Sequence, residues 1–137
     1  DPFLRFWFRY IEGNQGLIDN GMSSVLEHDI AESYETFSGP MLEQFFRQKL
    51  MRTGKYTAVG SWWKQERGAQ GNQNAVDIIA VGRDRKSAFV AEVKRQKKSF
   101  REGVFLDKVE NLKKSVLAGY KIQTACLTLD DLRSPIP

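Results

Sequence analysis

Two carboxylates and a lysine are the residues whose types and spacing could carry out chemistry. Asp77 lies within one apolar run, and Glu92-Val93-Lys94 ends the next apolar run along the chain. Hard divalent cations such as Mg²⁺ bind carboxylate oxygens and fill their remaining positions with water and substrate phosphate. A lysine beside such a cation can position the attacking water or stabilise developing negative charge. The pattern therefore predicts hydrolysis of phosphodiester bonds.

This chemistry requires both carboxylates to lie on the same face of a sheet. Residues 75–81 and 87–94 have the composition of neighbouring strands, and the segment 82–86 between them is typical of a hairpin turn. If the hairpin closes with a two-residue loop at Asp84-Arg85, or with a four-residue loop over residues 83–86, Asp77 lies opposite Glu92. A slip of one residue would move one carboxylate to the other face of the sheet.

Directly opposed like charges destabilise a sheet, because their Cβ atoms lie only about 4.5–5.5 Å apart. A bound Mg²⁺ would offset the repulsion between Asp77 and Glu92, and strand alternation brings Lys94 to the face of Glu92. The flanking residues are apolar on both faces, as expected of central strands, and buried carboxylates need a counter-charge or a metal. The alternatives to a metal site are charged strand ends or a structural ion pair.

The composition limits the kinds of site that the chain can build. Its 137 residues fit one globular domain, and its formal net charge of +4 permits an anionic partner without requiring one. It has one cysteine, Cys126, and one histidine, His28, so a Cys/His zinc site cannot form within the chain. Any metal must be bound by oxygen. No apolar stretch of about 18 residues and no secretory signal is present, so we expect a cytoplasmic protein without a membrane segment.

The first residues predict a helical arm ahead of the main domain. Asp1-Pro2 is a typical helix start, and aromatic residues follow at helical spacing as far as Tyr10. Asn20-Gly21 then interrupts the chain. We therefore expect an arm over residues 1–20 and a main domain over residues 21–137. Because the chain opens without an initiator Met, we also expect it to be part of a longer polypeptide.

The remaining pattern predicts helices and strands in the order helix, strand, strand, strand, helix, strand. The expected elements before the hairpin are a helix over 22–36, a helix from Ser38-Gly39-Pro40 to about Arg52, a strand over 56–64 and a polar loop over 65–74. The later helix is expected to turn Phe105, Leu106, Val109, Leu112 and Val116 inward and Lys108, Lys113 and Lys114 outward, with Gly119 at its end. A last strand is expected over 120–129.

Glu43 lies at the margin of the apolar stripe of the helix that begins near Pro40, close to Leu50 on the helical wheel. From there a carboxylate can reach a site between helix and sheet. The equally weighted alternative is an ordinary glutamate at the boundary of the core.

A basic run directly follows Glu92 and leads away from the predicted site. Such clusters are often solvated surface, but at this position they would suit phosphate contacts of a nucleic acid. The expected nucleic-acid-binding residues are Lys94, Arg95, Lys97, Lys98 and Arg101.

The order of elements, together with Asp77 on the second strand and Glu92-Val93-Lys94 on the third, resembles the PD-(D/E)xK (restriction-endonuclease-like) superfamily over about residues 38–129. The resemblance implies an α/β fold of mixed α+β type, with an αβββαβ core and a central mixed sheet flanked by helices. More narrowly, the chain looks like the nuclease-like C-terminal domain of prokaryotic archaeal-type AAA+ ATPases. The segments that carry the narrower resemblance are Phe6-Trp7-Phe8-Arg9-Tyr10, Val59-Gly60-Ser61-Trp62-Trp63, Val76-Asp77-Ile78-Ile79-Ala80 and Glu92-Val93-Lys94.

The resemblance also implies roles for individual residues. Asp77 and Glu92 would bind Mg²⁺ or Mn²⁺, with the backbone carbonyl of Val93 as a further ligand. Lys94 would position or polarise the attacking water. Glu43 would be a second metal ligand or would orient the first ligands.

Two further points of the resemblance concern the motif and the chain context. Gln96 would assist catalysis, and Val76 stands where the motif's name has a proline, a departure common in the superfamily. In the narrower family, an AAA+ module and a winged helix precede this domain. The upstream part of the same polypeptide would then be a partner.

Three functions are consistent with these patterns. The first is a Mg²⁺-dependent nuclease that hydrolyses DNA and forms the C-terminal part of a larger ATPase. The second is a catalytically silent module that binds nucleic acid or regulates that ATPase. The third is a docking domain for the ATPase, suggested by the aromatic arm. The oligomeric state is left open.

Overall fold

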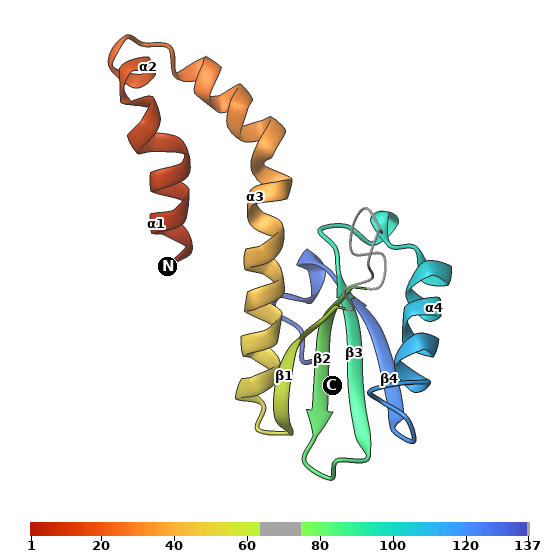
Figure 1. Ribbon diagram of the computed structural model, residues 1–137. Helices are drawn as coiled ribbons and strands as arrows, with labels where there is room; N and C mark the ends of the chain where they lie inside the picture. The colour runs from red at the N-terminus through yellow and green to blue at the C-terminus, as the bar shows by residue number, and fades with distance from the viewer. Residues whose placement is uncertain (64–74, 137) are drawn as a thin grey trace. The chain divides into compact units, whose positions relative to one another are not determined.

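The chain forms two compact units in a computed structural model that describes residues 1–63 and 75–136 (Figure 1). The first unit is Asp1–Met41 and the second is Leu42–Pro137. The expected division into an arm over 1–20 and a domain over 21–137 stays a prediction, because compactness does not test which segment folds independently. Within the described residues, no helix is long and apolar enough to cross a membrane.

The first unit is entirely helical. Its elements are α1 (Pro2–Phe6), one turn of π-helix η1 (Trp7–Ile11), a 3₁₀ turn η2 (Glu12–Asn14), α2 (Gln15–Asp19) and the first part of α3 (Ser23–Arg52). The Asp1 side chain caps α1 by accepting hydrogen bonds from the backbone N–H groups of Phe3 and Leu4, which confirms the predicted helix start.

Tyr10 is the centre of the packing in the first unit and is 4% exposed. Its ring lies 5.1 Å from that of Phe6 and 5.3 Å from that of Phe37, and its hydroxyl lies 2.7 Å from Ser33 Oγ. Phe3, Trp7 and Phe8 stay exposed. The arm therefore buries only part of its aromatic surface within its own unit.

The prediction of two separate helices, over 22–36 and from Ser38, was wrong. Helix α3 runs without a break from Ser23 to Arg52 and contains Pro40. A proline inside a helix removes one backbone hydrogen bond and costs about 3 kcal/mol. We attribute the continuity to tertiary packing, because Leu26 before the proline and Phe46 after it are both buried.

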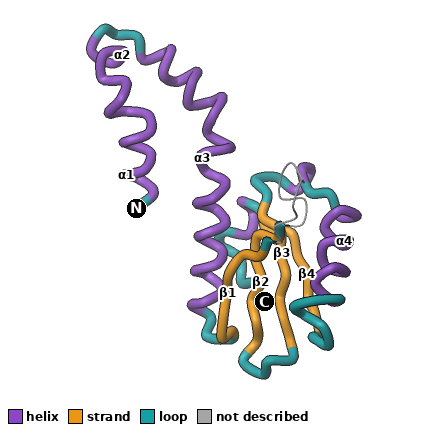
Figure 2. Tube along the Cα trace, viewed as in Figure 1, coloured by secondary structure: helices purple, strands orange, loops and turns teal. Residues whose placement is uncertain are grey.

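The second unit contains one mixed sheet (Figures 1 and 2). The strands are β1 (Tyr56–Trp62), β2 (Val76–Gly82), β3 (Ser87–Val93) and β4 (Lys121–Leu127), in the spatial order β1-β2-β3-β4. The first two pairings are antiparallel, and β3 pairs with β4 in parallel through a crossover that contains α4 (Glu102–Lys113). Short 3₁₀ turns follow β3 at Lys97–Ser99 (η3) and β4 at Leu129–Asp131 (η4).

This arrangement confirms the predicted αβββαβ order and the mixed sheet of an α+β fold. The first strand was predicted as far as residue 64, and its end and the predicted loop over 65–74 lie outside the described residues.

Helices α3 and α4 contribute to two separate clusters of buried residues. The cluster on the α3 side contains Phe46, Leu50, Ile78, Ala80, Phe89 and Ala91. The cluster on the α4 side contains Ala88, Val90, Phe105, Val109, Leu112 and Leu117. Since neighbouring β3 residues alternate between the clusters, both faces of the central strands are covered, which explains their continuous apolar runs.

The predicted inner face of α4 was correct in part. Phe105, Val109 and Leu112 are buried, whereas Leu106 is 44% exposed and Val116 is 53% exposed. The helix ends at Lys113 rather than near Gly119, so the chain after it no longer follows helical spacing. Leu117 takes the buried place that helical spacing had assigned to Val116.

Candidate functional site

The turn between β2 and β3 sets the register on which the candidate site depends. The Arg85 N–H donates to the carbonyl of Gly82 over 2.9 Å, and Arg85 takes a left-handed backbone with φ of 54°. Asp84 Oδ1 accepts from the backbone N–H groups of Lys86 and Ser87 and from the Ser87 hydroxyl. The hairpin therefore closes with the four-residue loop that was one of the two predicted forms.

The register of β2 against β3 brings the two predicted carboxylates together. The paired residues run from Val81 opposite Ala88 to Ile78 opposite Ala91. Continuing the same register by one pair places Asp77 opposite Glu92, as predicted from the sequence. Both residues lie at the end of the sheet away from the hairpin turn.

Asp77 is half-buried, and its carboxylate is held by the neighbouring strand. Its Oδ2 accepts a hydrogen bond of 2.8 Å from the backbone N–H of Val93. Burial raises the pKa of Asp77, the hydrogen bond from Val93 opposes that rise, and the charge of Glu92 adds to it. Val93 thus meets Asp77 through its N–H, and the role predicted for its carbonyl stays a prediction.

Glu92 is paired with two ammonium groups. Its Oε1 lies 2.9 Å from Lys94 Nζ and 3.8 Å from Lys108 Nζ. The side chains of Glu92 and Lys108 are 13% and 14% exposed, against 33% for Lys94. Burial disfavours the charged form of Lys94, but the hydrogen bond and charge of Glu92 outweigh this and raise its pKa. Lys94 is therefore a cation and a hydrogen-bond donor at neutral pH.

Lys108 was predicted to face outward, and that prediction was wrong. Its ammonium reaches the end of the sheet because α4 packs over β3 with Phe105 and Val109 inward. Lys108 lies three residues after Phe105 and directly before Val109, so it is at the margin of the buried face. A long aliphatic stem lets a lysine cover apolar surface from such a position while its charge reaches a partner.

Glu43 lies near Asp77, on α3, and is joined to it through Arg47. Arg47 Nη1 is 3.5 Å from Glu43 Oε2 and donates to the backbone carbonyl of Asp77 over 3.0 Å. Burial raises the pKa of Glu43, and the charge of Asp77 raises it further. Arg47 was not singled out from the sequence, although its place one helical turn after Glu43 is a usable signal.

The remaining predicted residues lie after β3, and most of them are exposed. Gln96, Lys97, Lys98 and Arg101 are exposed, and Arg95 is half-buried. The backbone carbonyl of Arg95 accepts from the N–H of Leu129, which ties the start of this segment to the chain after β4. The roles of these residues in catalysis or nucleic-acid binding stay predictions.

The donor set decides which metal the site could hold. Among the described residues, no three side chains of His, Cys, Asp or Glu converge closely enough to bind one ion. The opposed carboxylates of Asp77 and Glu92 could supply oxygen ligands, with water and substrate phosphate completing the shell. Mg²⁺ is commonly bound in this way, whereas structural zinc sites use four protein ligands.

The fold and the site define a class of protein: a mixed α+β domain that presents two opposed carboxylates and two lysines at one end of its sheet. The sequence profile of the DUF234 family, described as "Archaea bacterial proteins of unknown function", matches residues 7–106. The chain therefore belongs to that family.

An uncharacterized protein of Methanocaldococcus jannaschii is similar to this chain, at 30% identity over 101 residues. The similarity covers 69% of this chain but 21% of the relative, so the chain spans about a fifth of the relative's length. No solved structure matched the chain.

Proposed function

We propose that this domain is a metal-dependent nuclease of the PD-(D/E)xK type that hydrolyses DNA. The observation that carries the proposal is the register of the β2–β3 hairpin, observed as far as Ile78 opposite Ala91, which would bring Asp77 opposite Glu92 if it continues by one pair. Lys94, whose ammonium lies 2.9 Å from Glu92, supplies the third member of the motif. The element order and the position of Glu43 on the helix before the sheet support the same assignment.

Each of the chain's own groups has a task in this proposal. A divalent cation bound by Asp77 and Glu92 would supply an activated water and neutralise charge on the phosphate. The protonated Lys94 donates to the attacking water or to a phosphoryl oxygen. Lys108 and the N–H of Val93 hold the two carboxylates in place, and burial around them strengthens their electrostatic interactions.

The basic run after β3 is the proposed first contact for DNA. Lys97, Lys98 and Arg101 are exposed and can reach phosphates without disturbing the core. The domain would act as part of a longer ATPase. The greater length of the archaeal relative is consistent with this part of the proposal.

A catalytically silent nucleic-acid-binding or regulatory module is the second candidate. One observation favours it: Glu92 already has two cationic partners, Lys94 and Lys108, and so needs no metal for charge balance. In that case Lys94 is a structural partner of Glu92.

Nicking of supercoiled plasmid in Mg²⁺ or Mn²⁺ separates the two candidates. The nuclease proposal expects cleavage by the wild type and a loss of at least about 100-fold in Asp77→Asn and Lys94→Met, as is usual when a catalytic group is removed. Glu110→Gln, a change at an exposed carboxylate of α4, is the matched control and should cleave normally. If the wild type does not cleave, or if Asp77→Asn cleaves as well as it does, the nuclease proposal is wrong.

Titration calorimetry with Mn²⁺ gives an independent readout of the site. The wild type should bind Mn²⁺, and Asp77→Asn should bind it at least about tenfold more weakly, because one of two carboxylate ligands is lost. If Asp77→Asn binds Mn²⁺ as tightly as the wild type does, the metal does not bind at this site.

A further inference from the structure

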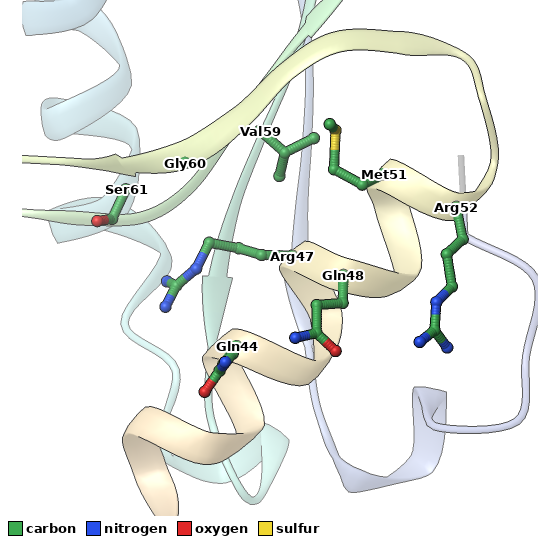
Figure 3. Close-up of a pocket in the computed structure, with 8 residues that line it drawn as sticks. All are labelled: Gln44, Arg47, Gln48, Met51, Arg52, Val59, Gly60 and Ser61. Atoms are coloured by element: carbon green, nitrogen blue, oxygen red, sulfur yellow. The ribbon is translucent and has the colours of Figure 1, made fainter. Parts of the chain in front are cut away.

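A groove lies between the second half of α3 and strand β1, and its volume is about 510 Å³. Figure 3 shows its two walls, one from the helix and one from the strand. The lining residues are Gln44, Arg47, Gln48, Met51 and Arg52 from α3 and Val59, Gly60 and Ser61 from β1.

The helical wall is a single stripe of α3. From Gln44 to Arg52 its members follow each other at intervals of three, one, three and one residues, which is the spacing of one helical face. The apolar face of the same helix, with Phe46 and Leu50, covers the sheet. The opposite wall is β1, which is an edge strand.

The chemistry of the lining suits an anionic ligand with polar and apolar parts. Arg47 and Arg52 provide guanidinium groups, and the two glutamines and Ser61 provide hydrogen-bond donors and acceptors. None of the eight lining residues is acidic. Met51 and Val59 form an apolar portion, on which the face of a base can lie.

Arg47 connects the groove to the candidate site. The residue lines the groove, and its Nη1 donates to the backbone carbonyl of Asp77 over 3.0 Å. Arg47 is also paired with Glu43, so one guanidinium is shared by the groove, Glu43 and the backbone of Asp77. The groove volume is within the usual range for ligand sites of about 300–1,000 Å³, and such a site suits a nucleotide unit of one strand better than a duplex.

We propose that this groove binds one strand of the nucleic-acid substrate, with Arg47 and Arg52 contacting its phosphates and the glutamines contacting sugars or bases. The inference rests on the proposed nuclease function and specifies where the substrate strand runs. The groove is separate from the basic run at 94–101, which the sequence had indicated as the nucleic-acid contact.

Fluorescence anisotropy with a labelled single-stranded oligonucleotide tests the groove, using the 137-residue chain in EDTA so that binding is measured without cleavage. Arg52→Glu should weaken binding at least about fivefold, and Arg52→Ala should reduce the slope of log affinity against log salt by about 0.7. Gln48→Ala, which removes no charge, should weaken binding about twofold to threefold with little change in that slope. Lys114→Glu, at the exposed end of α4, is the charge-matched control and should bind like the wild type.

Each outcome separates the groove from the nuclease chemistry. If Arg52→Glu and Gln48→Ala bind as tightly as the wild type, or if Lys114→Glu is weakened as much as Arg52→Glu, the groove does not bind the strand. Asp77→Asn should keep its oligonucleotide affinity while losing plasmid nicking. If binding depends on the groove but the wild type does not nick plasmid, the groove proposal is supported and the nuclease proposal is wrong.

Discussion

Glu92 is balanced by two ammonium groups that come from different elements. Lys94 follows it on the same strand, and Lys108 reaches it from α4. Both Glu92 and Lys108 are largely buried, so the pair is screened by solvent far less than a surface ion pair. Removing either lysine would leave the negative charge of Glu92 only partly balanced.

We therefore expect Lys108→Met to lower the free energy of unfolding by about 1–2 kcal/mol, measured by urea denaturation. Lys113→Met is the matched control on the same helix, because Lys113 is 49% exposed and pairs with an exposed glutamate. The control should change stability little. Equal effects of the two substitutions would show that the contact between Lys108 and Glu92 stabilises the fold no more than the exposed ion pair of Lys113 does.

Asp77 is the residue at which the proposed function and stability oppose each other. Burial and the charge of Glu92 disfavour its ionised form, and this raises its pKa. An asparagine can still accept the hydrogen bond from Val93 but carries no charge. Asp77→Asn should therefore raise the free energy of unfolding by about 1 kcal/mol in metal-free buffer, as is common when a functional charge is removed. A destabilised variant would mean that the carboxylate is needed structurally.

At the scale of elements, the β2–β3 hairpin determines whether the site exists. Its turn is held by Asp84, whose carboxylate accepts from the N–H groups of Lys86 and Ser87 and from the Ser87 hydroxyl. A Cβ added at Gly82 would meet the Ser87 hydroxyl, so a larger residue there would push that hydroxyl away from Asp84. The turn thus excludes the slipped registers that would separate Asp77 from Glu92.

Asp84→Ala should lower the melting temperature at neutral pH, and Asp84→Asn should lower it less because its amide oxygen can still accept. These hydrogen bonds hold the pKa of Asp84 below its ordinary value. A depressed pKa means that the stabilisation is present above the pKa of the unfolded chain and is lost as pH falls through the folded value. The difference between wild type and Asp84→Ala should therefore narrow as pH falls below the ordinary pKa of an aspartate, and a difference that stays constant with falling pH would contradict this role.

At the scale of the whole molecule, α3 is the element shared by the two compact units. In the second unit, its buried face supplies Phe46 and Leu50 to the core, and its polar face lines the groove. The side-chain ammonium of Lys49, on the same helix, donates hydrogen bonds to the backbone carbonyls of Asp131, Leu132 and Ser134. One helix thus supports the core, the end of the chain and the proposed substrate groove.

Two adjacent phenylalanines test how much the second unit depends on this helix. Phe46 is fully buried, whereas Phe45 is 43% exposed. Phe46→Ala should lower the free energy of unfolding by about 3–5 kcal/mol, because it opens a cavity in the core, and Phe45→Ala by less than about 1 kcal/mol. Urea denaturation followed by circular dichroism measures both. Similar losses would show that α3 is not oriented as described.

The sequence by itself determined the order of elements and the register of the β2–β3 hairpin, on which the proposed pairing of Asp77 with Glu92 depends. Both follow from local rules: apolar residues repeat with the period of a strand or helix, and the turn between β2 and β3 has a composition that permits few loop lengths. The same local rules wrongly divided α3 near Pro40. They count the free-energy cost of a proline inside a helix, but not the burial of residues on either side that offsets this cost.

Only the tertiary structure decided which side chains meet at the site and beside it. Lys108 and Arg47 lie at the margins of their helical faces, where helical spacing alone allows either solvent or a partner. How each helix is rotated and packed against the sheet sends Lys108 to Glu92 and Arg47 to Asp77 and the groove. These contacts join residues far apart in the chain, so no local pattern records them.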